Sequence, residues 1–241
     1  MANRQRAEAR RKAAAKASRQ EGGSKVWLWS AVGAIVAIAL IVVVVVTTSG
    51  DNSTADGSTS TSVDNVFPDS QPVTLDGDPL PTFNDEGAAD EALGVTAPAL
   101  SGTNFKGEPV VIDPAANGPY MLVFLAHWCP HCNAEVPVLL DWKNSGAVPA
   151  GLNIVGIATA VAPTAPNYPP YQWFSNKGWS WPVLVDQKTE DGVAGVAAQA
   201  FGASGWPFFV IIGEDGTVKA RGSGEKTIAE LQAIVDEALA S

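Results

Sequence analysis

Cysteine is almost absent from this chain: 241 residues include only Cys129 and Cys132, which two residues separate. This scarcity excludes a framework of several disulfides. No cysteine lies directly after the long apolar segment near the N-terminus, so a lipid-modified cysteine anchor is excluded there. A pair with this spacing is a zinc half-site, a tight structural disulfide or a redox pair, and each makes different demands on its neighbours.

Structural zinc needs four ligands, and residues 127–132 are too short a stretch to wrap them tetrahedrally around one ion without strain. A structural disulfide would close a tiny loop and would stabilise little, because the entropy removed from the unfolded chain grows with loop length. A redox pair is therefore the principal interpretation. At the junction of a buried strand and a helix, unpaired backbone N–H groups favour a thiolate. We predict that Cys129 is an exposed, attacking thiol and Cys132 the buried resolving thiol.

Basic residues are scarce beyond residue 25, where seven Lys and Arg stand against twenty-three Asp and Glu. This acidic part is expected to repel nucleic acid and anionic lipid surfaces. The other eight bases are Arg4, Arg6, Arg10, Arg11, Lys12, Lys16, Arg19 and Lys25. Residues 1–25 are therefore predicted to be a basic cytoplasmic tail, because Lys and Arg beside a membrane helix stay on the cytoplasmic side.

Charged side chains are missing altogether from Val26 to Val46. At about 1.5 Å per residue, this run can cross a hydrocarbon core of about 30 Å. We predict a transmembrane helix over residues 26–48, with a cleaved signal peptide as the alternative. The chain is then a single-pass protein of the cell membrane, with its N-terminus in the cytoplasm and its C-terminal domain outside it.

Apolar residues are sparse again in residues 49–92. Up to about residue 70 the stretch consists largely of Ser, Thr, Asp, Asn and Gly, which cannot bury enough apolar surface to offset the entropy of ordering. Residues 71–91 are rich in Pro and Asp and fit either more linker or an ordered extension. We therefore predict a flexible linker with a possible ordered extension over 49–92, followed by a globular domain over 93–241.

Apolar runs alternate with helical stretches in residues 93–241, which is typical of βα units around a central sheet. The Asp-Gly pair at 215–216 indicates a β-hairpin, and Thr227–Glu230 has the pattern of a capping box. We predict an α/β fold with a central mixed sheet flanked by helices. The expected strands are 109–113, 120–126, 152–158, 183–185, 208–212 and 217–220, and the expected helices are 130–144, 171–177, 193–201 and one that begins after Thr227.

The motif Trp128-Cys129-x-x-Cys132-x-x-Glu135-x-Pro137, with Gly205-Trp206-Pro207 before an apolar strand, resembles the thioredoxin superfamily. Within it, the motif is similar to the membrane-anchored TlpA/ResA branch, over the chain from about residue 97 to its end. The resemblance implies a thioredoxin-like fold and a protein disulfide oxidoreductase without a cofactor or a metal. It also implies a cis peptide bond before Pro207, which makes Trp206 and Pro207 the candidate substrate-binding residues.

The resemblance also suggests roles for the residues around the cysteines. Trp128 would shield the disulfide. Glu135 would tune the acidity of the cysteines, in place of the buried Asp that ordinary thioredoxins carry at the position of Val123. The dipeptide Pro130-His131 matches that of the strongly oxidising DsbA proteins, in which the imidazole stabilises the thiolate.

We therefore predict a membrane-anchored extracytoplasmic thiol-disulfide oxidoreductase that acts on protein thiols or disulfides and exchanges electrons with a membrane or soluble redox partner. The motif around the cysteines favours a reductase or general exchange, whereas Pro130-His131 favours the alternative of a DsbA-like oxidase. A further alternative is a copper-handling thioredoxin-fold module. Thiolates and imidazoles suit Cu(I), and its ligands would be His127, Cys129, His131 and Cys132.

Overall fold

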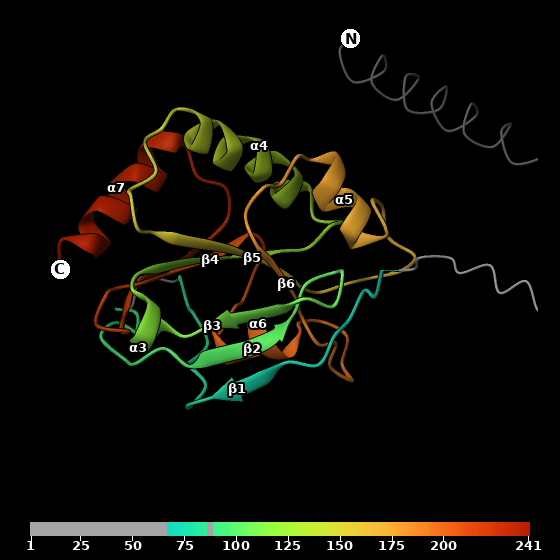
Figure 1. Cartoon of the computed structure of the whole chain (residues 1–241), viewed down its shortest axis with the longest axis horizontal. Coiled ribbons are helices and arrows are strands. Elements are labelled where there is room, and N and C mark those ends of the chain that lie inside the picture. The colour runs from blue at the N-terminus through green and yellow to red at the C-terminus, as the bar shows by residue number, and fades with distance from the viewer. Residues whose placement is uncertain (1–66, 86–88) are drawn as a thin grey trace, which may run out of the picture. The chain divides into compact units, whose positions relative to one another are not determined.

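The computed structural model describes residues 67–85 and 89–241, so the predicted tail (1–25), the predicted transmembrane helix (26–48) and the linker up to residue 66 lie outside them. Within the described ranges no helix has the length and apolar character that a bilayer crossing requires. Along the chain (Figure 1) the elements are β1 (Thr74–Asp76), β2 (Ala99–Thr103), β3 (Pro109–Ile112), α3 (Pro114–Asn117), β4 (Tyr120–Leu125), α4 (Pro130–Asn144), β5 (Asn153–Ala158), α5 (Pro170–Asn176), β6 (Val183–Val185), α6 (Val196–Ala200), β7 (Phe208–Ile212), β8 (Val218–Ser223) and α7 (Ile228–Leu239).

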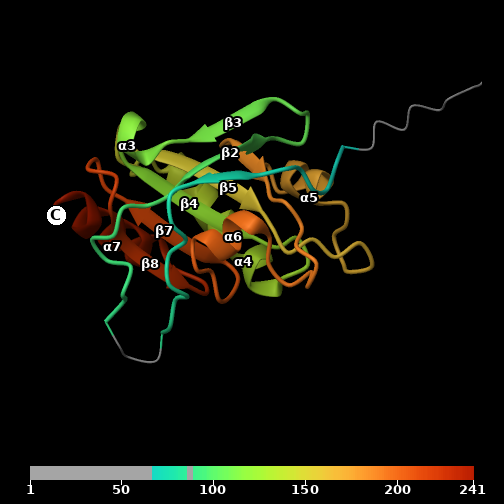
Figure 2. The same ribbon diagram turned by 90° about the horizontal axis from the view of Figure 1, so that it is seen from below.

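Five strands form the main sheet in the order β6-β5-β4-β7-β8. Strands β4, β5 and β6 are parallel, whereas β7 is antiparallel to β4 and β8 is antiparallel to β7. This mixed sheet confirms the predicted α/β class. Helices α4 and α7 lie against one face of it, and β1–β3 with α6 lie against the other (Figures 1 and 2).

The central strand β4 is buried along its whole length, because both faces of the sheet are covered. Its side chains alternate between the two faces. Met121, Val123 and Leu125 belong to the hydrophobic cluster that includes the buried face of α4 and α7. Leu122 and Phe124 belong to the cluster on the other face. The strand therefore joins the two halves of the core, and it leads directly into the cysteine turn.

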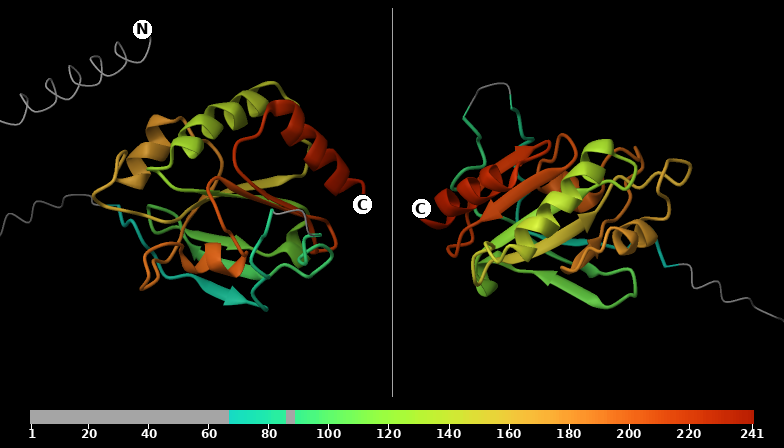
Figure 3. Two further views of the ribbon diagram at one scale, coloured as in Figure 1. Left: turned by 180° about the vertical axis from the view of Figure 1, so that it is seen from behind. Right: turned by 90° about the horizontal axis from the view of Figure 1, so that it is seen from above.

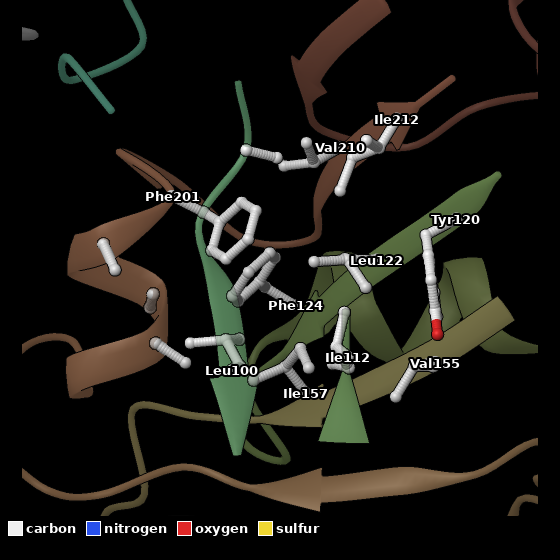
Figure 4. Packing of buried hydrophobic residues seen from close by; sticks show 14 of the residues in the cluster. Leu100, Ile112, Tyr120, Leu122, Phe124, Val155, Ile157, Phe201, Val210 and Ile212 are labelled. Atoms are coloured by element: carbon white, nitrogen blue, oxygen red, sulfur yellow. The ribbon is translucent and has the colours of Figure 1, made fainter. Parts of the chain in front are cut away.

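The cluster beneath the sheet is shared between β4, the small sheet and α6 (Figure 4). Leu100 on β2 and Ile112 on β3 are fully buried there. Next to them, the rings of Phe124 and Phe201 lie 5.8 Å apart between centroids. Because β2 and β3 contribute fully buried residues to this cluster, the small sheet is part of the core.

The small sheet has the order β1-β2-β3, and all its pairings are antiparallel. Its first strand lies in the stretch 71–91, whose state the composition left open. The backbone N–H of Leu80 donates to the carbonyl of Ala200, and that of Phe83 donates to the carbonyl of Gly202, both at 2.8 Å. Residues 71–85 therefore form an ordered extension that packs along the domain.

The residues that lead into the extension lie beside α5 and the loop that precedes it. Phe67 lies against Tyr171, with 4.7 Å between ring centroids. The hydroxyl of Tyr168 donates to the carboxylate of Asp69 at 3.1 Å, and Lys188 Nζ pairs with the same carboxylate at 2.9 Å. The first described residues are thus bound to the domain by ring contacts and by charge.

A buried ion pair joins Asp90, which follows the extension in the chain, to β8. The side chain of Arg221 is fully buried, and Nε donates to Asp90 Oδ2 at 2.9 Å while Nη2 pairs with Oδ1. Nη1 donates to the carbonyls of Pro81 at 2.7 Å and Phe201 at 3.0 Å. Hydrogen bonds from the guanidinium lower the pKa of Asp90, so the pair stays ionised. Arg221 therefore ties the extension and the end of α6 to the sheet.

The predicted elements agree with the structure in most places and differ in a few. Helix α4 and strands β6 and β7 have the predicted bounds, and α4 and α7 lie side by side on one face (Figure 3). Helix α6 is shorter than the predicted 193–201, because the carboxylate of Asp186 accepts hydrogen bonds from the backbone N–H groups of Ala197 and Ala198 at its first turn. Strand β8 runs three residues beyond the predicted 217–220, and β1, β2 and α3 were not predicted.

Replacing Arg221 with Met should destabilise the domain by about 3 to 5 kcal/mol, because the stem is kept but Asp90 loses its buried partner. Urea denaturation of the two proteins gives this difference. The matched control is Lys219→Met on the same strand, which removes a cation whose partner Asp215 is 55% exposed. Surface pairs contribute little, so the control should change far less. Equal losses in the two variants would show that the buried pair has no special role.

Candidate active site

The two cysteines lie where β4 passes into α4. Cys129 is the N-cap residue of α4, and Pro130 occupies the first helical position, where its missing N–H costs nothing. The N–H of Cys129 donates to the carbonyl of Ala126 at 3.0 Å, and the carbonyl of Cys129 accepts from Asn133 N–H at 3.1 Å. Both sulfurs therefore stand in the first turn of a fifteen-residue helix, near its unpaired N–H groups.

Both thiols are free and buried, which was predicted for Cys132 but not for Cys129. Cys132 is fully buried, as predicted, and burial raises its pKa far above the ordinary value for a thiol. Cys129 retains only 4% of its surface, so the prediction of an exposed sulfur is wrong in this form of the molecule. The physical reason is packing, since Cys129 belongs to the same hydrophobic cluster as Cys132 and lies against Trp206.

The loop before β7 covers Cys129. The Sγ atom of Cys129 donates to the carbonyl oxygen of Trp206 at 3.4 Å. The peptide bond between Trp206 and Pro207 is cis, as the resemblance implied. The indole of Trp206 packs against both core clusters, so it is part of the wall of the site. The structure thus brings Cys129 into contact with Trp206, whose cis peptide bond leads to Pro207.

Glu135 lies one turn beyond Cys132, and its side chain is fully buried. Its Oε2 accepts a hydrogen bond from the backbone N–H of Lys226 at 2.8 Å, whereas Oε1 has no partner among the described residues. Burial raises the pKa of Glu135 to about 7; Lys226 opposes the rise, and the carboxylates of Glu225 and Glu230 add to it. The negative charge of Glu135 in turn contributes, after burial, to the raised pKa of Cys132. A carboxyl group that titrates near neutrality thus stands next to the resolving thiol.

The side chain of His131 is largely exposed and contacts a carboxylate. Its Nδ1 lies 2.6 Å from Glu225 Oε1, and the two side chains are 66% and 47% exposed. The imidazole that was predicted to stabilise the thiolate is therefore bound by a carboxylate instead. Glu225 follows the last strand of the sheet, so no local sequence signal pointed to it.

His127 has a structural role. Its Nδ1 contacts the carbonyl of Pro166 at 2.8 Å, and its Nε2 accepts from the N–H of Ala162 at 3.3 Å. Those partners define a neutral ring that carries its proton on Nδ1, and burial lowers the pKa of His127. Both ring nitrogens are occupied, so neither is available as a metal ligand.

The copper interpretation fails on the same geometry. Across residues 67–85 and 89–241 no three His, Cys, Asp or Glu side chains gather in an arrangement that could hold a metal ion. His127 is committed to backbone partners, and His131 is paired with Glu225. The four side chains proposed as copper ligands are thus adjacent in sequence but do not converge.

Trp128 and Asn133 brace the cysteine turn through hydrogen bonds to backbone carbonyls. The indole N–H of Trp128 donates to the carbonyl of Ala160 at 2.7 Å. Asn133 Nδ2 donates to the carbonyls of His127 at 3.1 Å and Cys129 at 2.9 Å, and its Oδ1 accepts from Trp173 Nε1 at 2.9 Å. Sequence reasoning missed Asn133, because an Asn within a helix is ordinary until its partners are known.

The sequence matches one family model and several curated proteins. Residues 75–236 match the family model described as Redoxin. The soluble secreted antigen MPT53 of Mycobacterium tuberculosis is 43% identical over 72 residues, which are 30% of this chain. The chain spans 37% of the length of that curated relative.

Two solved structures are also similar. A thioredoxin-family thiol:disulfide interchange protein of Chlorobium tepidum is 28% identical with a TM-score of 0.47, over 62% of this chain and 99% of that one. A secreted disulfide oxidoreductase of Mycobacterium tuberculosis, homologous to E. coli DsbE, is also 28% identical with a TM-score of 0.44, over 61% of this chain and 98% of that one.

Replacing Asn133 with Ala should destabilise the domain by about 2 to 4 kcal/mol, because three hydrogen bonds are lost and the indole N–H of Trp173 loses its partner. Urea denaturation measures the change. Asn144→Ala is the matched control, since it makes the same substitution at an exposed position of the same helix. A loss at Asn133 no greater than that of the control would contradict the bracing role.

Replacing Glu135 with Gln should change the pH dependence of stability. Below about pH 4.5 the carboxyl group is protonated in both the folded and the unfolded chain. Its full contribution to the free energy of unfolding is therefore present there. Because the folded pKa is raised to about 7, that contribution is lost as the pH rises from about 4.5 through 7. The stability of the native protein relative to Glu135→Gln should fall by about 3 kcal/mol across this window.

Urea denaturation of both reduced proteins between pH 4 and 9 tests this expectation. Glu237→Gln, the same change at an exposed position of α7, is the control and should show no comparable loss. A stability difference between the native protein and Glu135→Gln that stays constant with pH would show that the carboxyl group is not perturbed by burial.

Proposed function

The chain belongs to the Redoxin family, and from that premise we propose that it is a thiol-disulfide oxidoreductase of the thioredoxin-like fold that acts on protein thiols and disulfides. One observation carries the proposal. The sulfur of Cys129 stands in the first turn of α4 and faces the carbonyl of Trp206, with the Cys132 thiol buried behind it. An attacking sulfur, a resolving sulfur and a backbone edge for the substrate are thus in one place.

In the reductive direction, the thiolate of Cys129 attacks one sulfur of a substrate disulfide. The substrate S–S bond breaks, a mixed disulfide forms on Cys129, and the first substrate thiolate leaves. The thiolate of Cys132 then attacks the Cys129 sulfur, which breaks the mixed disulfide and releases the second substrate thiolate. Two electrons pass to the substrate, whose thiolates take up two protons, and the protein is left with a Cys129–Cys132 disulfide.

The second step needs a proton acceptor, because burial holds Cys132 in the thiol form. Glu135 suits this role, since it lies one turn away, has a pKa of about 7, and has one oxygen that finds no hydrogen-bond partner within residues 67–85 and 89–241. Its carboxylate takes the proton of Cys132 as the mixed disulfide is resolved, and it returns that proton when the pair is reduced again. Glu135 thus occupies the role of the buried Asp that Val123 replaces.

The proposed direction is reduction or general exchange, and its support is the similarity of the Trp-Cys-x-x-Cys-x-x-Glu-x-Pro motif to the TlpA/ResA branch. We place the domain outside the cytoplasm, on a single membrane helix over residues 26–48. The apolar run and the basic flank support this placement. The mycobacterial relative described as a secreted antigen is consistent with an extracytoplasmic domain.

Replacing Cys129 with Ser in the full chain should reduce the rate of insulin disulfide reduction by dithiothreitol at least about 100-fold, to the uncatalysed rate, because the attacking sulfur is gone. Replacing Cys132 with Ser should instead trap a mixed disulfide between Cys129 and the substrate. In non-reducing electrophoresis this complex should migrate more slowly than the free protein, and dithiothreitol should release it. The matched control for trapping is the double variant, which has no sulfur to attack. Full activity in Cys129→Ser, or equal trapping by the control, would refute the function.

A further inference from the structure

We propose that Glu225 is a positioning residue that sets the reduction potential of the cysteine pair by holding the imidazole of His131 and placing a carboxylate beside it. The inference rests on the proposed function, because it takes Cys129 and Cys132 to be a redox couple. Glu225 lies 94 positions from His131 in the sequence, yet the two side chains are in direct contact, with 2.6 Å between Nδ1 and Oε1.

The loop that carries Glu225 is bound to the active site on both sides of that residue. The N–H of Gly224 donates to the carbonyl of Pro207 at 2.9 Å. The N–H of Lys226 donates to Glu135 Oε2 at 2.8 Å. Three consecutive residues therefore contact three different parts of the site: the cis-proline loop, the dipeptide between the cysteines and the buried carboxyl group. This anchoring holds the backbone of Glu225 in a fixed place beside His131.

The nearest cation of the loop is not the partner of Glu225. Lys226 Nζ donates to the backbone carbonyls of Ser223 at 2.7 Å, Gly224 at 3.0 Å and Glu225 at 3.4 Å. The ammonium group is thus bonded to the loop backbone, and it also lies 5.7 Å from the ring centroid of Phe209. The carboxylate of Glu225 is left to pair with the imidazole.

This pairing bears on the potential through the charge near Cys129. An imidazole at the second position of α4 can stabilise the thiolate of the reduced form when it is cationic and turned toward the sulfur. Glu225 engages Nδ1 of the ring and places a negative charge beside it. Both effects weaken the stabilisation of the thiolate, and a less stable reduced form makes the disulfide a weaker oxidant. Glu225 thus moves a Pro-His dipeptide away from strongly oxidising behaviour.

The test is a redox titration of the full chain at pH 7. The protein dithiol and one glutathione disulfide exchange to give the protein disulfide and two glutathione thiols, with two electrons and two protons transferred. In Glu225→Gln the equilibrium should shift about threefold to tenfold toward the protein dithiol, which is about 14 to 30 mV at 29.6 mV per tenfold change. Glu214→Gln is the matched control, because it removes an exposed carboxylate at the far end of the β7–β8 hairpin.

The same substitution in two further backgrounds identifies the route. In His131→Gln, the shift caused by Glu225→Gln should fall to less than half, because the imidazole that transmits it is gone. In Glu135→Gln the shift caused by Glu225→Gln should persist, because the contact between Lys226 and Glu135 does not transmit it. An unmoved equilibrium in Glu225→Gln, or an equal shift with and without His131, would overturn the proposal.

The native protein separates this inference from the function on which it rests. If the native chain forms no reversible disulfide with glutathione, the oxidoreductase function fails and the inference fails with it. If the native chain titrates as a two-electron couple while Glu225→Gln behaves like the Glu214→Gln control, only the role of Glu225 is refuted.

Discussion

The structure depends on the burial of one strand, because everything that contacts the cysteines is placed relative to the end of β4. Its side chains enter both halves of the core in alternation, so the strand can neither slide nor rotate without exposing apolar surface on one face. Its end therefore delivers Cys129 to a fixed point at the start of α4. The antiparallel neighbour β7 begins directly after Pro207, and its pairing of Phe208 with Phe124 brings the cis-proline loop to the same end of the sheet. The site is thus a product of strand register.

The sequence predicted most of this framework, and the reasons are local. Strand β4 is a continuous apolar run, α4 begins with Pro at its first position, and Thr227 and Glu230 form the predicted capping box. In each case the residues that define the element also stabilise it. Strands β1 and β2 escaped prediction because Thr74–Asp76 and Ala99–Thr103 are neither apolar nor strictly alternating. They are strands because of the partners with which they pair, and partners are a property of the whole fold.

The same distinction separates the parts of the site that were foreseen from those that were not. The cysteines, Trp128, Glu135, Trp206 and Pro207 belong to motifs that can be read along the chain. Asn133, Glu225 and Lys226 act through contacts that join positions distant in sequence, such as the bond from Lys226 to Glu135. The enclosure of Cys129 also depends on distant packing, because the Trp206 loop that covers it lies 77 positions away. Long-range contacts of this kind carry no periodicity and no composition signal.

The contacts of the first described residues have a mechanical consequence. Asp69 is bonded to Tyr168, and the ring of Tyr168 meets that of His127 edge to face at 5.9 Å between centroids. His127 stands two residues before Cys129. A pull applied to the chain at Phe67 would therefore load the ring contact with Tyr171 and the bonds of Asp69, and it would reach the cysteine turn through Tyr168 and His127. The Arg221 anchor lies further along the chain, so it would take up strain only after those contacts had yielded.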